Sequence, residues 1–110
     1  MSRLFVDVDD TLIVRNGRDW CPNRIVGEFV RAWHAANPDG AITVWSMRGP
    51  MYAARFGGNL LRGIPHRAMG KAQIVPEPGD LFIDDNPYPV FASATVHPAR
   101  LREYQEANHG

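Results

Sequence analysis

Acidic side chains follow two apolar runs of this sequence, at Asp7 and Asp9 and again at Asp84 and Asp85. The carboxyl ends of parallel strands meet at one edge of a sheet, and sites of α/β folds form at that edge. Four carboxylates gathered there would repel one another, and a hard divalent cation with oxygen ligands relieves that repulsion. The sequence therefore predicts a Mg²⁺ site, with Asp7 and Asp84 as its natural carboxylate ligands.

Other polar residues near these aspartates suit phosphoryl transfer. An ordinary aspartate is ionised at neutral pH, which suits Asp7 as a nucleophile, while Asp9 would move protons as the general acid/base. Ser46 follows another apolar run and can donate a hydrogen bond to a phosphoryl oxygen. Lys71 can place a compact positive charge against the phosphate or the nucleophile. We therefore predict Asp7, Asp9, Ser46 and Lys71 as catalytic residues.

Three apolar runs carry most of these residues, and each has the composition of a buried strand. They span residues 4–8, 41–45 and 81–83. After the first run, apolar residues from Asn23 onward recur at helical spacing until a breaker at 37–40. This alternation predicts an α/β fold with a mostly parallel central sheet.

The remaining segments carry weaker signals. Turn residues predict a loop over 14–22, and Pro50 is expected to begin a second helix that Gly57 and Gly58 weaken or end early. The other expected elements are a short strand at 66–69, a loop at 76–79, a short helix after Pro87, a strand at 94–96 and a helix from Pro98.

Length and composition restrict the class of protein. The chain has 110 residues, which fits a single domain over residues 1–110. Twelve basic and twelve acidic residues balance, which argues against a surface for bulk nucleic-acid binding but not against a local basic patch. The single Cys21 forms no internal disulfide, and no apolar run approaches the ~20 residues of a membrane span. With no signal-peptide pattern, these features favour a soluble cytoplasmic protein with no membrane partner.

The chemistry-bearing residues also match a family pattern. The run from Asp7 to Leu12 (Asp-Val-Asp-Asp-Thr-Leu), after an apolar strand, resembles the first motif of the haloacid dehalogenase (HAD) superfamily. Ser46 resembles its second motif, and Lys71 upstream of Asp84-Asp85 resembles the third and fourth. The resemblance extends from about Leu4 to Asn86 with the motifs in the family's order. The first motif is fairly specific, whereas a serine after a strand is common.

This resemblance implies a three-layer Rossmann-like core in which Asp7 forms an aspartyl-phosphate that water then hydrolyses. It implies that Asp9 acts as general acid/base and gives its backbone carbonyl to the metal. It also implies that Thr11 supports the loop and that Asp85 assists Asp84. An aspartate two positions after the nucleophile is similar to the phosphatases and phosphomutases of the family. The gaps between motifs leave no room for a cap domain, so an open site is expected, which disfavours a mutase.

The motifs leave the substrate open. A phosphorylated small molecule, a nucleotide or a nucleic-acid terminal phosphate fits, with Thr11, Ser46, Arg48 and Lys71 as candidate binding residues. A nucleotide or nucleic-acid end is favoured slightly, because a loop with Arg15, Arg18 and Trp20 can stack on a base or pair with phosphates. That loop, and Arg48 as well, fits a solvated surface equally well. Open sites of the family act on larger substrates or are covered by a neighbouring subunit, so a homo-oligomer is compatible with the pattern.

Alternative hypotheses keep the fold class without the enzyme. A phospho-accepting receiver domain has similar acidic residues, but there the phosphorylated aspartate follows the acidic pair and the lysine comes last; here Lys71 precedes Asp84. A non-catalytic phosphate-binding or regulatory module would be free to lose Asp7 or Asp9. Taken separately, the aspartate pairs and Ser46 also fit turn or helix-cap roles, and Lys71 fits a solvated position.

Overall fold

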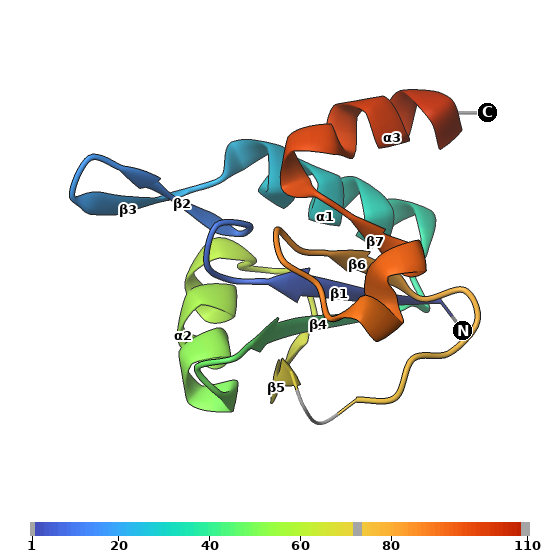
Figure 1. Ribbon diagram of the computed structural model, residues 1–110, viewed down its shortest axis with the longest axis horizontal. Helices are drawn as coiled ribbons and strands as arrows, with labels where there is room; N and C mark the ends of the chain where they lie inside the picture. The colour runs from blue at the N-terminus through green and yellow to red at the C-terminus, as the bar shows by residue number, and fades with distance from the viewer. Residues whose placement is uncertain (1, 72–73, 109–110) are drawn as a thin grey trace.

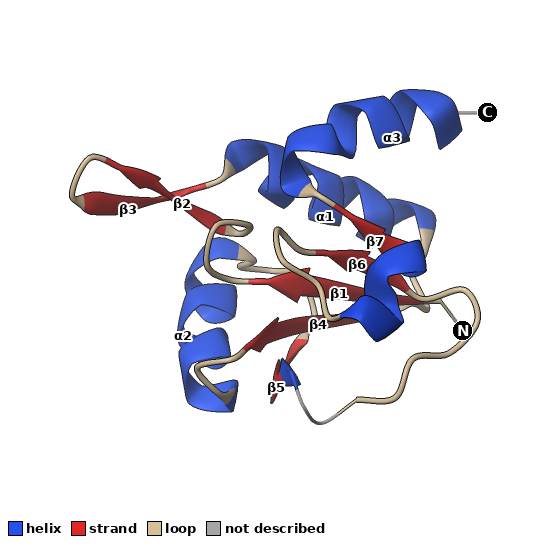
Figure 2. Cartoon of the chain, in the orientation of Figure 1, coloured by secondary structure: helices blue, strands red, loops and turns tan. Residues whose placement is uncertain are grey.

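The computed structural model describes residues 2–71 and 74–108, in which strands alternate with helices (Figures 1 and 2). In chain order the elements are the strands β1 (Arg3–Asp7), β2 (Ile13–Asn16) and β3 (Asp19–Pro22), helix α1 (Arg24–Ala36), strand β4 (Ala41–Ser46), helix α2 (Pro50–Leu60), strands β5 (Arg67–Gly70) and β6 (Leu81–Ile83), the 3₁₀ helix η2 (Pro89–Ala94), strand β7 (Thr95–Val96), the 3₁₀ helix η3 (Pro98–Arg100) and helix α3 (Leu101–Asn108).

A five-stranded parallel sheet forms the centre of the domain. Its order is β5-β4-β1-β6-β7, so that β1 lies in the middle, and every pairing within it is parallel. The register aligns Asp7 at the end of β1 with Trp45 of β4, one residue before Ser46. The predicted α/β fold with a parallel sheet is confirmed, and its strands β1, β4 and β6 lie where the three apolar runs predicted them.

The predicted loop over residues 14–22 is wrong, because these residues form most of an antiparallel hairpin of β2 and β3. Asn16 pairs with Asp19, which leaves Gly17 and Arg18 as a two-residue turn. Gly17 takes the first turn position with a φ of 68°, a conformation that glycine adopts without steric cost. The turn residues that suggested a loop are thus the signal of a hairpin, which projects from the sheet (Figure 1).

Helix α2 continues to Leu60, so the prediction that its glycines end it early is wrong. The reason lies in packing at Gly57. A Cβ atom at this position would lie 2.9 Å from Nε2 of His66 and 3.1 Å from Cγ2 of Val44. Gly57 therefore lets the helix approach β4 closely, and that tertiary packing outweighs the low helix propensity of glycine.

The main hydrophobic core lies on one face of the sheet. Alternate residues of β1, such as Leu4 and Val6, point into it, and all three α-helices contribute buried side chains. Helices α1 and α3 contact one another, with the rings of Phe29 and Tyr104 at 6.1 Å (Figure 1). This face holds the strands, and therefore the strand ends, in fixed positions.

The opposite face is covered more thinly by a cluster of aromatic rings. Phe5 of β1 stacks on Phe82 of β6 at 4.7 Å, and Phe82 and Trp45 both contact Phe91 of η2. Ile74 packs against the same cluster. Among the described residues this layer has one 3₁₀ helix and an extended segment, where the other face has three α-helices.

None of the described helices is both long and apolar enough to span a bilayer.

Candidate active site

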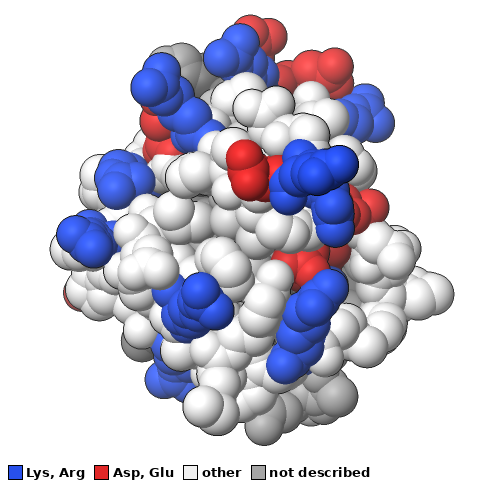
Figure 3. All heavy atoms as spheres, turned by 90° about the vertical axis from the view of Figure 1, so that its left-hand side faces the viewer, with Lys and Arg blue, Asp and Glu red and all other residues white. Residues whose placement is uncertain are grey.

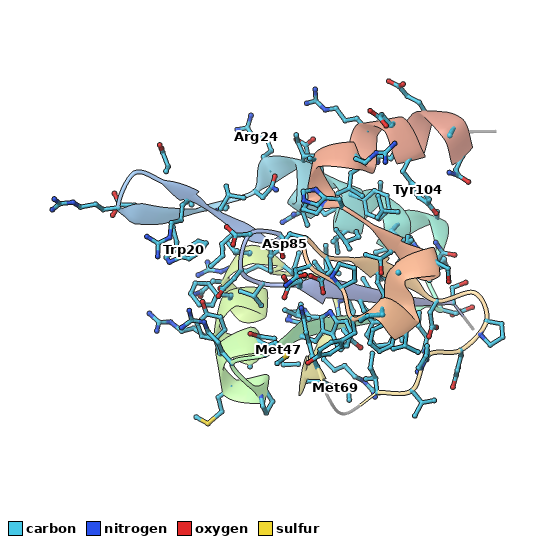
Figure 4. The ribbon with its side chains drawn as sticks, viewed as in Figure 1. Trp20, Arg24, Met47, Met69, Asp85 and Tyr104 are labelled. Atoms are coloured by element: carbon cyan, nitrogen blue, oxygen red, sulfur yellow. The ribbon has the colours of Figure 1, made fainter. Side chains whose placement is uncertain are left out.

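The fold brings the predicted catalytic residues to one edge of the sheet. Asp7 and Ser46 are the last residues of β1 and β4, and Lys71 and Asp84 directly follow β5 and β6. The side chains of these four strand-end residues are all buried. Figure 4 shows Asp85 and Met47 at this same edge, toward which the arrows of β1 and β4 point.

Lys71 lies between two carboxylates. Its Nζ atom is 3.2 Å from Oδ1 of Asp7 and 2.7 Å from Oδ2 of Asp84, an oxygen that is itself fully buried. Burial by itself would lower the pKa of Lys71, but hydrogen bonding to Asp84 and the charges of Asp7 and Asp84 outweigh it and raise the pKa. The ammonium group of Lys71, the single lysine of the chain, therefore stays charged in the site.

One lysine does not balance the carboxylates around it. Oxygen atoms of Asp7, Asp84 and Asp85 lie within 4.8 Å of one another, a spacing that can hold a metal ion. Burial and the charge of Asp84 raise the pKa of Asp7 to about 8, although Lys71 opposes the shift. A bound cation would oppose this shift and favour the ionised form of Asp7 that a nucleophile requires. The possible ligands are all carboxylate oxygens, and they carry more negative charge than Lys71 balances. Such a set fits a hard divalent cation.

The turn after β1 fixes the orientation of Asp7. Thr11 is completely buried, and its hydroxyl donates to Oδ2 of Asp7 at 3.3 Å. Backbone N–H groups of Leu12 and Ile13 donate to the carbonyls of Asp7 and Val8. These contacts agree with the supporting role expected for Thr11, which does not line the pocket described below.

The chain reverses within this turn at Asp10. Its φ of 58° makes Asp10 the one non-glycine residue with positive φ in the described chain. Aspartate tolerates this left-handed conformation better than most residues. Asp10 therefore shapes the turn, and its exposed side chain lines the cavity described below together with Asp7 and Asp9.

Asp9 is held by two residues from the segment after β4. The Arg48 side chain donates from Nε to Oδ2 of Asp9 at 2.9 Å, and the Tyr52 hydroxyl donates to Oδ1 at 2.6 Å. Arg48 was predicted either to bind substrate or to lie on the surface; it lines the pocket with a side chain 64% exposed. Tyr52 was missed, and its only sequence signal is its position in the first turn of the helix after Ser46.

A cavity of about 470 Å³ opens over these groups. Asp7, Asp9, Ser46 and Lys71 line it together with Asp85. Its mouth includes two exposed apolar side chains that sequence reasoning missed, Met47 and Tyr88, and the Tyr88 hydroxyl donates to the Met47 sulfur. Size and lining suit a phosphate group with part of the molecule that carries it.

The β2–β3 hairpin stands beside this cavity and contributes none of its lining residues. Arg15 and Trp20 face each other across the hairpin, with the guanidinium 4.8 Å from the ring centroid. Trp20 also packs against the main core, and Figure 4 places it between the hairpin and α2. The predicted contact of this segment with substrate stays a prediction.

A second cavity, of about 480 Å³, adjoins the site on the other side of Asp85. Residues of β7 and α3 form its wall, including Val96 and Tyr104, and it shares Asp85 and Pro87 with the first. Ser46, Lys71 and Asp9 do not line it. The cavity above Asp7 is therefore the one in which the candidate catalytic groups converge.

Comparison of the sequence with protein-family models and with curated proteins, and of the structure with solved structures, found no match. The functional argument accordingly depends on the geometry of the site itself.

Proposed function

We propose that this protein is a Mg²⁺-dependent phosphomonoester phosphatase that works through an aspartyl-phosphate on Asp7, in a HAD-like core without a cap domain. The observation that carries this proposal is the contact of Lys71 with both Asp7 and Asp84, beside Asp85, in a buried corner with surplus negative charge. An ion pair with a purely structural role needs one carboxylate for each cation, whereas here two buried carboxylates contact one lysine and a third lies beside them.

In the first half of the reaction, a carboxylate oxygen of Asp7 attacks phosphorus. The new bond joins Asp7 to the phosphoryl group while the bond from phosphorus to the ester oxygen breaks. The leaving oxygen takes a proton from Asp9, whose carboxyl group is oriented by Arg48 and Tyr52. Ser46 and Lys71 line the cavity beside Asp7, where they can donate to the phosphoryl oxygens.

In the second half, water attacks the phosphorus of the aspartyl-phosphate and passes a proton to Asp9. This releases inorganic phosphate and restores Asp7. Asp7, Asp84 and Asp85, with the backbone carbonyl of Asp9, would hold the metal. When bound, Mg²⁺ neutralises charge on the phosphoryl oxygens and keeps Asp7 ionised.

The substrate is a phosphomonoester that reaches an open site, with a nucleotide or a nucleic-acid terminal phosphate favoured. The described segments after the first and second motifs support the absence of a cap. They contain only the β2–β3 hairpin with α1, and α2 with β5. The cavity mouth, with Met47 and Tyr88 exposed, leaves room for a substrate larger than its phosphate.

The test measures phosphate release from an aryl phosphate and a nucleotide panel, with Mg²⁺ and with chelator. We expect Mg²⁺-dependent release that Asp7→Asn abolishes. Asp39→Asn is the control, because Asp39 is an exposed carboxylate just before β4, at the opposite end of the sheet, and does not line the cavity. Full activity of Asp7→Asn would refute the proposal, as would release that is independent of the metal.

A further inference from the structure

The balanced net charge hides a strong segregation along the chain. Residues 40–76 contain five basic residues, whereas all twelve acidic residues of the protein lie outside this segment. The segment forms β4, α2 and β5, one flank of the sheet. Lys71 is neutralised inside the site, so the four arginines of the segment account for the positive charge of that flank.

These four arginines, Arg48, Arg55, Arg62 and Arg67, form a set that we call the α2 arginine strip. All four side chains are exposed. Arg48 lies at the rim of the cavity, Arg55 in α2 and Arg62 just past its end, each seven residues from the next. Arg48 and Arg62 lie just beyond the two ends of α2, whose eleven residues extend for about 16 Å, and Arg67 begins β5, which packs against α2. The strip thus leads away from the cavity.

The strip has almost no carboxylate partners. Within the described residues, Arg48 pairs with Asp9, and no carboxylate lies within ion-pair distance of Arg55, Arg62 or Arg67. In Figure 3, which faces the hairpin and α2 side of Figure 1, the lower part of the surface, toward α2, is predominantly blue and white. Unpaired cations on one flank attract a polyanion.

Arginine binds phosphates and carboxylates alike, so it is the aromatic neighbours of these cations that favour a nucleic acid as the ligand. Every member of the strip is arginine, whose planar guanidinium binds phosphate through two hydrogen bonds. Arg48 lies over the ring of Tyr52 at 5.3 Å and Arg55 over Phe56 at 5.6 Å, and the two rings contact each other at 4.8 Å. Positive groups that alternate with aromatic rings are typical of surfaces for single-stranded nucleic acids.

The rim of the cavity supplies the remaining element of such a surface. Met47 is 69% exposed and Tyr88 36% exposed, and both line the cavity that holds Asp7. An aromatic ring and a thioether at this point can pack against the base or sugar next to a phosphate that enters the site. The strip then lies where the following phosphates of a chain would pass.

We propose that the α2 arginine strip binds the backbone of a single-stranded nucleic acid whose terminal phosphate enters the cavity above Asp7. This inference rests on the proposed phosphatase function and narrows its substrate from phosphomonoesters in general to polynucleotide ends. A mononucleotide in the cavity would reach Arg48 at its rim but not Arg55, Arg62 or Arg67, which do not line the cavity.

The experiment compares an oligonucleotide of about ten nucleotides, with its phosphate at either the 5′ or the 3′ end, with the corresponding mononucleotides. We expect kcat/KM for one of the oligonucleotides to exceed that for its mononucleotide at least about tenfold at low salt. The double variant Arg55→Gln/Arg62→Gln should lose most of this advantage through KM, with mononucleotide turnover unchanged. Arg102→Gln, an exposed arginine of α3, is the matched control and should behave as wild type.

A binding measurement keeps this test independent of turnover. Fluorescence anisotropy of a labelled oligonucleotide without terminal phosphate should show affinity that falls with salt. The double variant should reduce the logarithmic salt slope by about 0.7 for each arginine–phosphate pair that the substitutions remove.

Equal turnover of oligonucleotide and mononucleotide would contradict the proposed role of the strip and leave the proposed phosphatase activity intact. If neither substrate releases phosphate but the oligonucleotide still binds in a salt-dependent manner, both the phosphatase activity and the binding of a terminal phosphate above Asp7 are contradicted. Equal competition by polyglutamate would point instead to an acidic protein partner and contradict the nucleic-acid assignment.

Discussion

An ion pair lies at each end of strand β1, partly buried at its start and buried at its end, and the two differ in the carboxylates around the cation. At its start, Arg3 donates to both carboxylate oxygens of Asp80, and the N–H of Glu77 donates to Asp80 as well. At its end, Lys71 faces Asp7 and Asp84 with Asp85 close by. Arg3 faces one buried carboxylate, Asp80, and the exposed carboxylate of Glu77 at 3.5 Å, whereas Lys71 faces two buried carboxylates with a third beside them.

The pKa values reflect this difference. Burial would raise the pKa of Asp80, but hydrogen bonds from Arg3 and Glu77 outweigh it and lower the pKa. At the other end, burial and the charge of Asp84 outweigh Lys71 and raise the pKa of Asp7 to about 8. Hydrogen bonds from Arg3 and Glu77 therefore favour the ionised form of Asp80, whereas the negative charge around Asp7 and Asp84 is where we propose that a cation binds. The lesson is to judge a buried ion pair by its charge balance.

The largest effect is expected from removal of Lys71. Lys71→Gln leaves Asp7 and Asp84 with no cation and takes a positive charge from beside the phosphoryl group. We expect kcat/KM to fall by about a thousandfold or more. Phosphate release at saturating Mg²⁺ measures this, with circular dichroism to show that the fold persists. Activity within a few-fold of wild type would mean that the lysine is only structural.

Mg²⁺ should stabilise the protein more at pH 8 than at pH 6. Because the pKa of Asp7 is raised above its unfolded value, its contribution to stability is fully present below about pH 4 and is lost as pH rises through about 8. A bound cation offsets that loss, and at a hundred times Kd binding adds about 2.7 kcal/mol. Thermal unfolding with and without Mg²⁺ measures the gain. Asp84→Asn should reduce it strongly, and an equal gain in that variant would place the metal elsewhere.

Removal of Asp80 should affect stability and leave catalysis intact. Asp80→Asn keeps the shape of the side chain but leaves Arg3 without its buried anion, which should cost about 2 kcal/mol of unfolding free energy in urea titrations at pH 7. Because the pKa of Asp80 is lowered, this stabilisation is present above about pH 4 and is lost as pH falls through the folded pKa. The difference between variant and wild type should therefore shrink at pH 3. A loss of activity at a temperature where the variant is folded would contradict the assignment of stability to the start of β1 and of catalysis to its end.

The smallest effect is expected at Tyr52. Tyr52→Phe removes the hydroxyl that donates to Asp9 and keeps the ring that packs against Phe56. We expect kcat to fall about five- to tenfold, with KM and Mg²⁺ affinity unchanged, because one positioning hydrogen bond contributes on the order of 1 kcal/mol. Phe56→Leu, which disturbs the packing instead, is the control and should retain kcat. A larger loss in the control than in Tyr52→Phe would assign Tyr52 to packing alone.

The sequence predicted the strands and the ends that carry the site, because local composition determines both. The apolar runs before Asp7 and Asp84 and after Gly40 identified three buried strands, and parallel pairing then brought their ends together. The hairpin was missed because its turn residues were interpreted as a loop, although a glycine at the first position of a two-residue turn, here Gly17 before Arg18, is a hairpin signal. The full length of α2 depends on Gly57 against His66 and Val44, a tertiary contact that propensity does not contain.

The sequence predicted the excess negative charge around Asp7 and Asp84 only in part. Clustered aspartates predicted mutual repulsion, but the largest cause of the raised pKa of Asp7 is its burial, which only the folded structure supplies. The partners of Asp9 were beyond sequence reasoning for a similar reason, since Arg48 and Tyr52 reach it from 39 and 43 residues away.

The most direct test of the central claim is to trap the phosphorylated carboxylate. Wild-type protein is mixed with substrate and Mg²⁺, quenched in acid during turnover and treated with borohydride, which reduces an aspartyl-phosphate to homoserine. Peptide mass spectrometry then locates the reduced residue. Our account predicts homoserine in place of Asp7 and at no other aspartate, and none in a chelator-treated sample. Steady phosphate release with Asp7 unreduced, or with the reduction at Asp9 or Asp84, would contradict the assignment of Asp7 as the nucleophile.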